Sequence, residues 1–302
     1  MKYETYCNIR IHENSGEAET IANAECNDFA GEYPRTFKVL SNVEGNYYHV
    51  CYEKQFSDDK EFNVLYQAAE AILLGELREN FLKRAKNEKF LLYPIKSEPE
   101  VAAIGKINKK QEVHLDKALE LLSSIGILHF EKSEKATVNF RPRSGKEPWE
   151  IIITNKNPGF LIHNGWFELY VAGEIKKAAK ESGLQDDGYE LTHGVKPYFL
   201  KNAITDVDIM LAFNGKALYV ETKTSNYRGT DGEKDLVDDI EKFAENIEIF
   251  GIPKDNACFV CLNKNDSQLK IMREKAARRF HVQDNRTFPT WIKNRITYLK
   301  NN

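Results

Sequence analysis

The chain has 302 residues, of which 41% are hydrophobic and 29% are charged. This composition is ordinary for a folded protein, and it argues against a disordered, collagen-like or disulfide-stapled chain. No apolar run approaches the length of a membrane helix or of a signal-peptide core, so we expect a cytoplasmic protein with no membrane partner. The five cysteines are dispersed along the chain, and we expect them to be reduced thiols.

Charge is distributed unevenly along the chain. The formal net charge is −3, yet residues 264–302 contain ten Lys or Arg against three Asp or Glu, so the rest of the chain is acidic. A basic segment on an acidic body favours contact with a polyanion, although such runs also occur on solvated surfaces. Within this segment we single out Arg278 and Arg279 as candidate phosphate-binding residues.

The first part of the chain predicts two small regions. Residues 1–60 show short strand patterns and residues 64–85 a helix pattern, which predicts a small N-terminal β-rich domain with one helix over 1–100. Residues 115–125 form a second helix pattern ended by Gly126, and two alternating segments follow it, so 101–155 is predicted to be winged-helix-like. Its helix carries few basic residues, which favours a packing or dimer-forming module over a DNA reader.

From residue 160 onward, helix and strand patterns alternate. The predicted elements are a helix over 166–182, a weak strand within 189–199, strong strands over 206–213 and 217–224, a helix over 234–250 and a buried strand over 257–262. Their order is α-β-β-β-α-β, which predicts an α+β fold with a mixed sheet over 156–302. Cys258 and Cys261 fall in the last strand without a second pair, so we expect core cysteines there.

The two strong strands are joined by Asn214-Gly215, which favours a type I′ hairpin. This turn predicts that Phe213 lies opposite Lys216. Continuing the register places four charged residues on one face of the sheet, as two opposed pairs: Asp208 with Glu221, and Asp206 with Lys223.

Two opposed carboxylates repel each other unless a cation lies between them. The hard oxygen ligands of Asp208 and Glu221 suit Mg²⁺ or Mn²⁺, with Lys223 as a further positive charge on the same face. An alternative is a solvated hairpin with its polar residues on the wet side. The same face also carries apolar residues such as Met210 and Tyr219, which favours the metal site.

Two further sets of residues are candidates for this site. Glu168 shares a helix stripe with apolar residues, whereas Glu174 is among the positions expected to be solvated, so Glu168 is a third, semi-buried carboxylate. The loop after the motif strand offers an aromatic and basic set suited to nucleic-acid contact and base stacking: Tyr227, Arg228 and Lys234. A plain surface loop is the alternative for this second set.

Asp208 followed by Glu221-Thr222-Lys223 resembles the PD-(D/E)XK nuclease superfamily. The resemblance implies a restriction-endonuclease-like core. It also implies an Mg²⁺ or Mn²⁺ ion held by Asp208, Glu221, Glu168 and the backbone carbonyl of Thr222, with Lys223 positioning or activating the attacking water. Asp206, which the register places opposite Lys223, is an auxiliary candidate.

A narrower resemblance extends over about residues 115–265. The segments PGFLIHNGWFELYV, TDVDIM and LYVETKT are similar to the nuclease domain of CRISPR-associated effectors activated by cyclic oligoadenylate. Phe167, Thr205-Asp206 and Thr222 depart from that pattern without removing a metal ligand. Residues 1–100 are too short and strand-rich for the nucleotide sensor of those effectors, so a small-molecule activator is not implied.

These resemblances imply a metal-dependent endonuclease in antiviral or CRISPR-linked defence, with DNA as the expected substrate and RNA as the alternative. A homodimer is a further expectation, because many nucleases of this kind pair to cut two strands. Two alternatives stay open. One is a sequence-specific restriction-type DNA endonuclease, and the other is a non-catalytic nucleic-acid-binding or assembly protein with a nuclease-like fold.

Overall fold

The structure is a computed structural model that describes residues 11–12, 36–43, 46–52, 59–82, 85, 89–94, 104–132, 149–153, 165–185, 188–195, 198–199, 202–203, 207–213, 216–225, 227, 229–249 and 252–302. Its contacts divide the chain into two compact units. The first unit is Met1–Ser57 with Val171–Asn302, and the second unit is Asp58–Tyr170. No described helix has the length and apolar character needed to cross a membrane.

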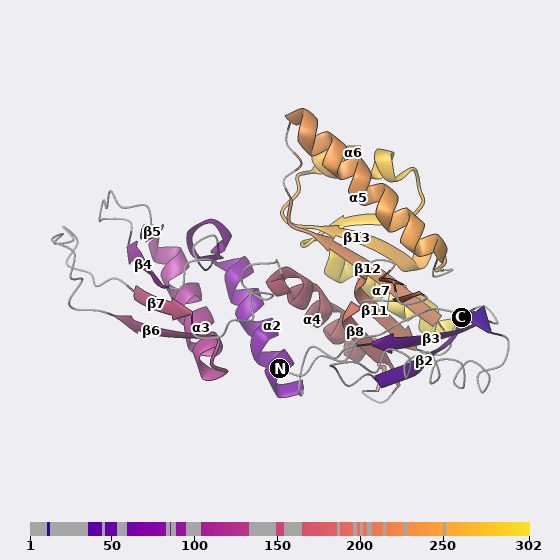
Figure 1. The fold of residues 1–302 in the computed structure, drawn as a ribbon, viewed down its shortest axis with the longest axis horizontal. Coiled ribbons are helices and arrows are strands. Elements are labelled where there is room, and N and C mark those ends of the chain that lie inside the picture. Colours follow the sequence, from indigo (N-terminus) through magenta and orange to yellow (C-terminus); the bar gives the residue numbers. More distant parts are fainter. Residues whose placement is uncertain are drawn as a thin grey trace. The chain divides into compact units, whose positions relative to one another are not determined.

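The second unit combines two packed helices with a four-stranded sheet (Figure 1). Helix α2 (Asp59–Leu74) packs against α3 (Lys109–Ser124), and the apolar stripes of both are buried. The sheet order is β5-β4-β7-β6. Its strands are β4 (Lys89–Pro94), β5 (Ile104–Ile107), β6 (Leu128–Lys132) and β7 (Trp149–Ile153).

The predicted helix over 64–85 is interrupted. It begins earlier, ends at Leu74, and is followed by a short π-helical segment, Arg78–Leu82. At the break, Glu76 has a left-handed backbone (φ 52°), and a Cβ on Gly75 would lie 2.7 Å from the Cβ of His114. The close approach of α2 to α3 therefore requires glycine at this point. Gly126, with φ 74°, follows the end of α3 where the sequence predicts a cap.

The two units divide the chain at different places from the predicted boundaries near residues 100 and 155. Strand β4 pairs with β7, which lies about sixty residues later, and α2 packs against α3, so these segments form one unit. The three strands of the N-terminal sheet cluster instead with the first unit; they are β1 (Ile11–His12), β2 (Thr36–Val43) and β3 (Asn46–Tyr52). The second strand of the predicted wing lies outside the described residues, and the winged helix stays a prediction.

The first unit is built on a five-stranded sheet of order β14-β13-β12-β11-β8. The strands are β8 (Glu190–Val195), β11 (Val207–Phe213), β12 (Lys216–Lys223), β13 (Ala257–Cys261) and β14 (His281–Asp284). β12, β13 and β14 run parallel, whereas β11 is antiparallel to both of its neighbours. The prediction of a mixed α and β fold with a mixed sheet is confirmed.

Helices of the first unit follow the predicted order. They are α4 (Gly165–Glu181), whose residues up to Tyr170 cluster with the second unit, α5 (Gly229–Ile249), α6 (Asp266–Ala276) and α7 (Phe288–Asn301). A short hairpin, β9 (Tyr198–Phe199) and β10 (Asn202–Ala203), lies between β8 and β11. The described elements therefore run α4, β8, β11, β12, α5, β13, with the β9–β10 hairpin inserted.

One face of the sheet is covered by α5 and α6 (Figure 1). Apolar residues of both helices pack on alternate residues of the strands, including Met210, Tyr219 and Phe259. Phe243 of α5 contacts the rings of Tyr219 and Phe259, with centroids 5.0 and 5.7 Å apart. This aromatic core fixes α5 over β12 and β13, and thereby places any polar residue that α5 carries near the ends of these strands.

Both cysteines of β13 belong to the core, as predicted. Cys258 and Cys261 are fully buried free thiols. Burial raises the pKa of the Cys261 thiol to about 12, so this thiol is protonated at neutral pH.

Candidate active site

The hairpin register that the sequence predicts is confirmed. Phe213 pairs with Lys216, and the pairing continues without a bulge to Ile209 with Val220. One further step brings Asp208 opposite Glu221. Because side chains alternate along a strand, these two share the face that carries Met210 and Tyr219.

That face is packed and not solvated. Met210, Tyr219 and Glu221 are 5%, 0% and 9% exposed. The alternative of a hairpin with its polar residues on a wet face is therefore wrong, because α5 and α6 cover the face up to the end of β12. The carboxylates of Asp208 and Glu221 thus lie at the margin of an apolar core, where charges are screened less than at a surface.

Asp208 is anchored across the two strands. Its Oδ2 accepts hydrogen bonds from the backbone N–H of Thr222 at 2.7 Å and from the Thr222 hydroxyl at 2.8 Å. Both donors come from the adjacent strand, fourteen residues away in sequence. Hydrogen bonds of this kind favour the ionised carboxylate and hold it in one orientation.

Glu221 and Lys223 form an ion pair on β12. The Nζ of Lys223 is 3.0 Å from Oε1 of Glu221, and the two side chains are only 27% and 11% exposed. Burial opposes the charge on Lys223, but Glu221, Asp239 and Asp208 outweigh it and raise its pKa above the ordinary value. Lys223 is therefore an ammonium group near neutral pH, suited to hydrogen-bond donation and charge stabilisation and not to acting as a base.

Asp239 is a residue of this site that the sequence analysis missed. It lies on α5, with Oδ1 3.5 Å from Lys223 Nζ and Oδ2 accepting a 2.6 Å hydrogen bond from the Tyr227 hydroxyl. A signal was present, because Asp239 stands three residues after Leu236 and four before Phe243, within the buried stripe of the helix. We call Asp208, Glu221, Lys223 and Asp239 the carboxylate cluster.

Tyr227 has a different place from the predicted one. Its ring packs against the apolar core, its hydroxyl bonds Asp239, and Lys264 Nζ lies 5.4 Å from the ring centroid. Burial, followed by the hydrogen bond to Asp239, raises the pKa of the Tyr227 hydroxyl. This inward position does not fit the predicted stacking on bases. Lys234 is exposed on α5, whereas Arg228 and Asp206 lie outside the described residues.

Two of the three glutamates of α4 were singled out from the sequence, and one of the two expectations is confirmed. Glu168 is half-buried in the first turn of α4, as predicted, but it belongs to the second unit, and its role as a metal ligand stays a prediction. Glu174 was expected to be solvated and is only 7% exposed, so that expectation is wrong. The apolar stripe of α4 is wider than its spacing suggests, since the helix is buried on most of its circumference.

Most cations of the basic segment bind the protein itself. Of its ten Lys and Arg, eight contact carboxylates, amide oxygens or backbone carbonyls: Lys264, Arg273, Lys275, Arg279, Arg286, Lys293, Arg295 and Lys300. Arg279 is bidentate to Glu241, with distances of 2.6 and 2.8 Å. Arg278 is exposed. The segment therefore fastens α6, β14 and α7 to the body, and phosphate binding is a prediction better placed on Arg278 than on Arg279.

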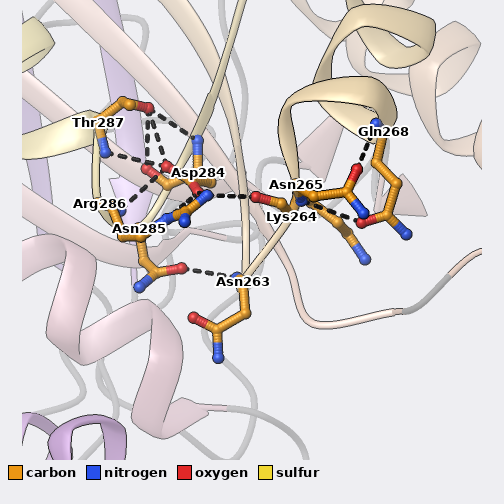
Figure 2. A network of polar contacts seen from close by, with 8 residues as sticks. All are labelled: Asn263, Lys264, Asn265, Gln268, Asp284, Asn285, Arg286 and Thr287. Carbon is orange, nitrogen blue, oxygen red and sulfur yellow. Dashed lines mark hydrogen bonds and ion pairs between the residues drawn. The ribbon is translucent and has the colours of Figure 1, made fainter.

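Figure 2 shows a second polar network beyond the ends of β13 and β14. Asp284 is fully buried and accepts hydrogen bonds from the backbone N–H groups of Arg286 and Thr287, from the Thr287 hydroxyl and from the Arg286 guanidinium. The guanidinium also bonds the carbonyl of Lys264, and Asn285 accepts from the N–H of Asn263. We call these residues the Asp284 network.

The donor set of the carboxylate cluster fits a hard divalent cation. Asp208 and Glu221 offer carboxylate oxygens and Thr222 a backbone carbonyl, which are the ligands that Mg²⁺ and Mn²⁺ prefer. Among the described residues, no group of three or more His, Cys, Asp or Glu is arranged to hold a metal ion. A cation at Asp208 and Glu221 would therefore take its other ligands from the backbone, water or substrate.

Comparisons with known proteins leave the family open. No protein-family model and no curated protein matches the chain. Among solved structures, the crystal structure of protein VC1899 from Vibrio cholerae is similar, with 15% identity and a TM-score of 0.48. The match covers 82% of this chain and 58% of that one, so this chain spans less than two thirds of the length of VC1899.

Proposed function

We propose that the chain is a metal-dependent phosphodiesterase, an endonuclease of DNA, with RNA as the alternative substrate. One observation carries the proposal. On two antiparallel strands, Asp208 accepts a hydrogen bond from the Thr222 backbone, and Asp208, Glu221 and Lys223 share one face of the sheet. Lys223 Nζ lies 3.0 Å from Glu221 Oε1. An Asp on one strand and a Glu-x-Lys on the next is the arrangement that the PD-(D/E)XK resemblance implies.

The proposed reaction is hydrolysis of a phosphodiester. The oxygen of a water molecule bonds to phosphorus and the water gives up one proton to solvent. The bond to one bridging oxygen breaks, and the leaving oxygen takes a proton. Asp208, Glu221 and the Thr222 carbonyl would hold the cation, which would supply Lewis-acid stabilisation of the phosphate oxygens. Lys223 donates hydrogen bonds to the attacking water or to a phosphate oxygen, where negative charge develops in the transition state.

The order of elements supports the same proposal at the level of fold. A helix, three strands, a helix and a strand occur as α4, β8, β11, β12, α5 and β13. The motif residues lie at the carboxyl end of β12, beside a parallel neighbour, β13. We propose a restriction-endonuclease-like core and, from the narrower sequence resemblance, a role in antiviral defence.

The proposal is tested by incubating the chain with labelled single-stranded DNA, double-stranded DNA and RNA in Mn²⁺ or Mg²⁺, with EDTA as control. We expect metal-dependent cleavage of DNA within the strand. Cleavage at one duplex sequence only would indicate the restriction-type alternative. Binding without cleavage of any substrate would contradict the proposal and favour the non-catalytic nucleic-acid-binding alternative.

A further inference from the structure

Lys223 lies between two carboxylates that come from different elements. Its Nζ is 3.0 Å from Glu221 Oε1 on its own strand and 3.5 Å from Asp239 Oδ1 on α5. The side chains of Glu221, Asp239 and Lys223 are 11%, 24% and 27% exposed, so salt and water screen their charges less than those of a surface pair. The ammonium group thus reaches a second partner without movement of the backbone.

Asp239 is itself held by the loop that follows β12. The Tyr227 hydroxyl donates to Asp239 Oδ2, and Tyr227 adopts a left-handed backbone (φ 45°) that is unfavourable for a bulky residue. Gly232 allows this, because a Cβ there would lie 2.5 Å from the carbonyl carbon of Tyr227. Buried Lys264 fastens the same loop by donating to the carbonyl of Ser225. The strained loop therefore fixes the orientation of the Asp239 carboxylate.

We infer that Asp239 is a positioning residue that takes the Lys223 ammonium group when a divalent cation occupies Glu221. The inference rests on the proposed function. A cation at Asp208 and Glu221 repels an ammonium group that lies 3.0 Å from Glu221. Because Asp239 is already within reach, Lys223 turns toward it and stays beside the site. Asp239 then determines where the charge of Lys223 meets the phosphate.

Thermal melts of the whole chain over a Mn²⁺ titration test the first step. Asp239→Asn removes the second partner of Lys223, which then competes with the cation for Glu221. The Mn²⁺ concentration for half of the full stabilisation should rise about tenfold. In a Lys223→Met background, Asp239→Asn should change this midpoint by no more than about twofold, since the competing ammonium group is gone. Asp238→Asn, at an exposed neighbouring position of α5, is the matched control and should leave the midpoint unchanged.

Single-turnover cleavage at saturating Mn²⁺, with the chain in excess over nucleic acid and its concentration varied, tests the second step. Asp239→Asn should slow the chemical step about 10- to 100-fold, because Lys223 is misplaced. KM should be retained, because substrate binding is unaffected. Tyr227→Phe keeps the carboxylate and removes only the hydroxyl that orients it, so a decrease of about fivefold is expected. Asp238→Asn should stay within about twofold of the wild type.

The outcomes separate this inference from the proposed function. If Asp239→Asn matches Asp238→Asn in both midpoint and rate while the wild type cleaves, the inference is overturned and the proposed function stands. If Asp239→Asn does not fold, Tyr227→Phe decides: a fivefold decrease in rate supports the inference, and an unchanged rate overturns it. A wild-type chain that neither cleaves nor is stabilised by Mn²⁺ overturns the proposed function and the inference with it.

Discussion

The carboxylate cluster and the Asp284 network lie at the ends of β12 and β14, two strands of one sheet that flank β13, yet they differ in how their carboxylates find partners. Asp284 takes its side-chain hydrogen bonds from Arg286 and Thr287, which follow it within three residues. The carboxylate cluster joins separate elements. Asp208 accepts a hydrogen bond from Thr222 of β12, and Asp239 of α5 accepts one from Tyr227 of the loop after β12. The hydrogen bonds to the Asp284 carboxylate form once its own loop folds, and Arg286 and Asn285 then tie this loop to the segment after β13. The carboxylate cluster exists only when two strands and a helix are in place.

The balance of charge differs as well. Around Asp284, a single carboxylate is surrounded by backbone N–H groups, a hydroxyl and a guanidinium. In the cluster, among the contacts that the structure describes, three carboxylates gather around the ammonium group of Lys223. Donors in excess stabilise a fold, and carboxylates in excess are tolerated where a cation binds. We therefore propose that the Asp284 network stabilises the fold and that the carboxylate cluster is the catalytic site.

The largest expected effect is on catalysis. Lys223→Ala should reduce the rate of cleavage by about 100- to 1000-fold, as the loss of a charge-stabilising donor does in other enzymes. Stabilisation by Mn²⁺ should survive, because an ammonium group cannot be a ligand of a cation. Single-turnover cleavage and Mn²⁺ melts on the same sample measure both effects. Full activity in this variant would remove Lys223 from the mechanism.

The next effect separates the two networks. Asp284→Ala should lower the free energy of unfolding by about 2 to 3 kcal/mol, because it leaves the donors around a fully buried carboxylate without their acceptor. The extra stability from Mn²⁺ should be unchanged. Urea unfolding with and without Mn²⁺ measures both, with Asp266→Ala, at an exposed position of α6, as control. A loss of the Mn²⁺ effect in Asp284→Ala would show that the two networks act as one.

The smallest effect concerns the basic segment. Nucleic-acid affinity falls with salt concentration, and on logarithmic axes each phosphate contact adds about one to the steepness of this fall, because the contact releases counterions. Arg278→Ala should therefore make the fall less steep by about one. Arg279→Ala should change this steepness less, since Arg279 is bound to Glu241. Fluorescence anisotropy from low to moderate salt compares the two variants. Equal slopes in both variants and the wild type would mean that neither arginine contacts phosphate.

The sequence predicts the parts of the site that depend on local rules. Asn214-Gly215 and the period of two were enough to place Asp208 opposite Glu221, because a two-residue turn sets the register of a hairpin. Asp239 was missed because its role depends on how α5 packs on the sheet. The sequence predicts phosphate binding for Arg279, because nothing in it indicates the ion pair with Glu241, which is thirty-eight residues away.

The predicted domain boundaries show the same limit. Helix patterns over the second unit were visible in the sequence, but the pairing of β4 with β7 was not. Contacts between segments so far apart are set by the complementarity of whole surfaces, and a single sequence contains no periodic signal for them. Local elements were therefore predicted more closely than the units they form.

The central claim is that a cation binds between Asp208 and Glu221, and melts with and without Mn²⁺ test it most directly. A cation at one hundred times its dissociation constant should stabilise the wild type by about 2.7 kcal/mol. Asp208→Asn and Glu221→Gln, each compared with its own melt without metal, should abolish most of this gain. An equal gain from Mn²⁺ in the wild type and in both variants would contradict the claim.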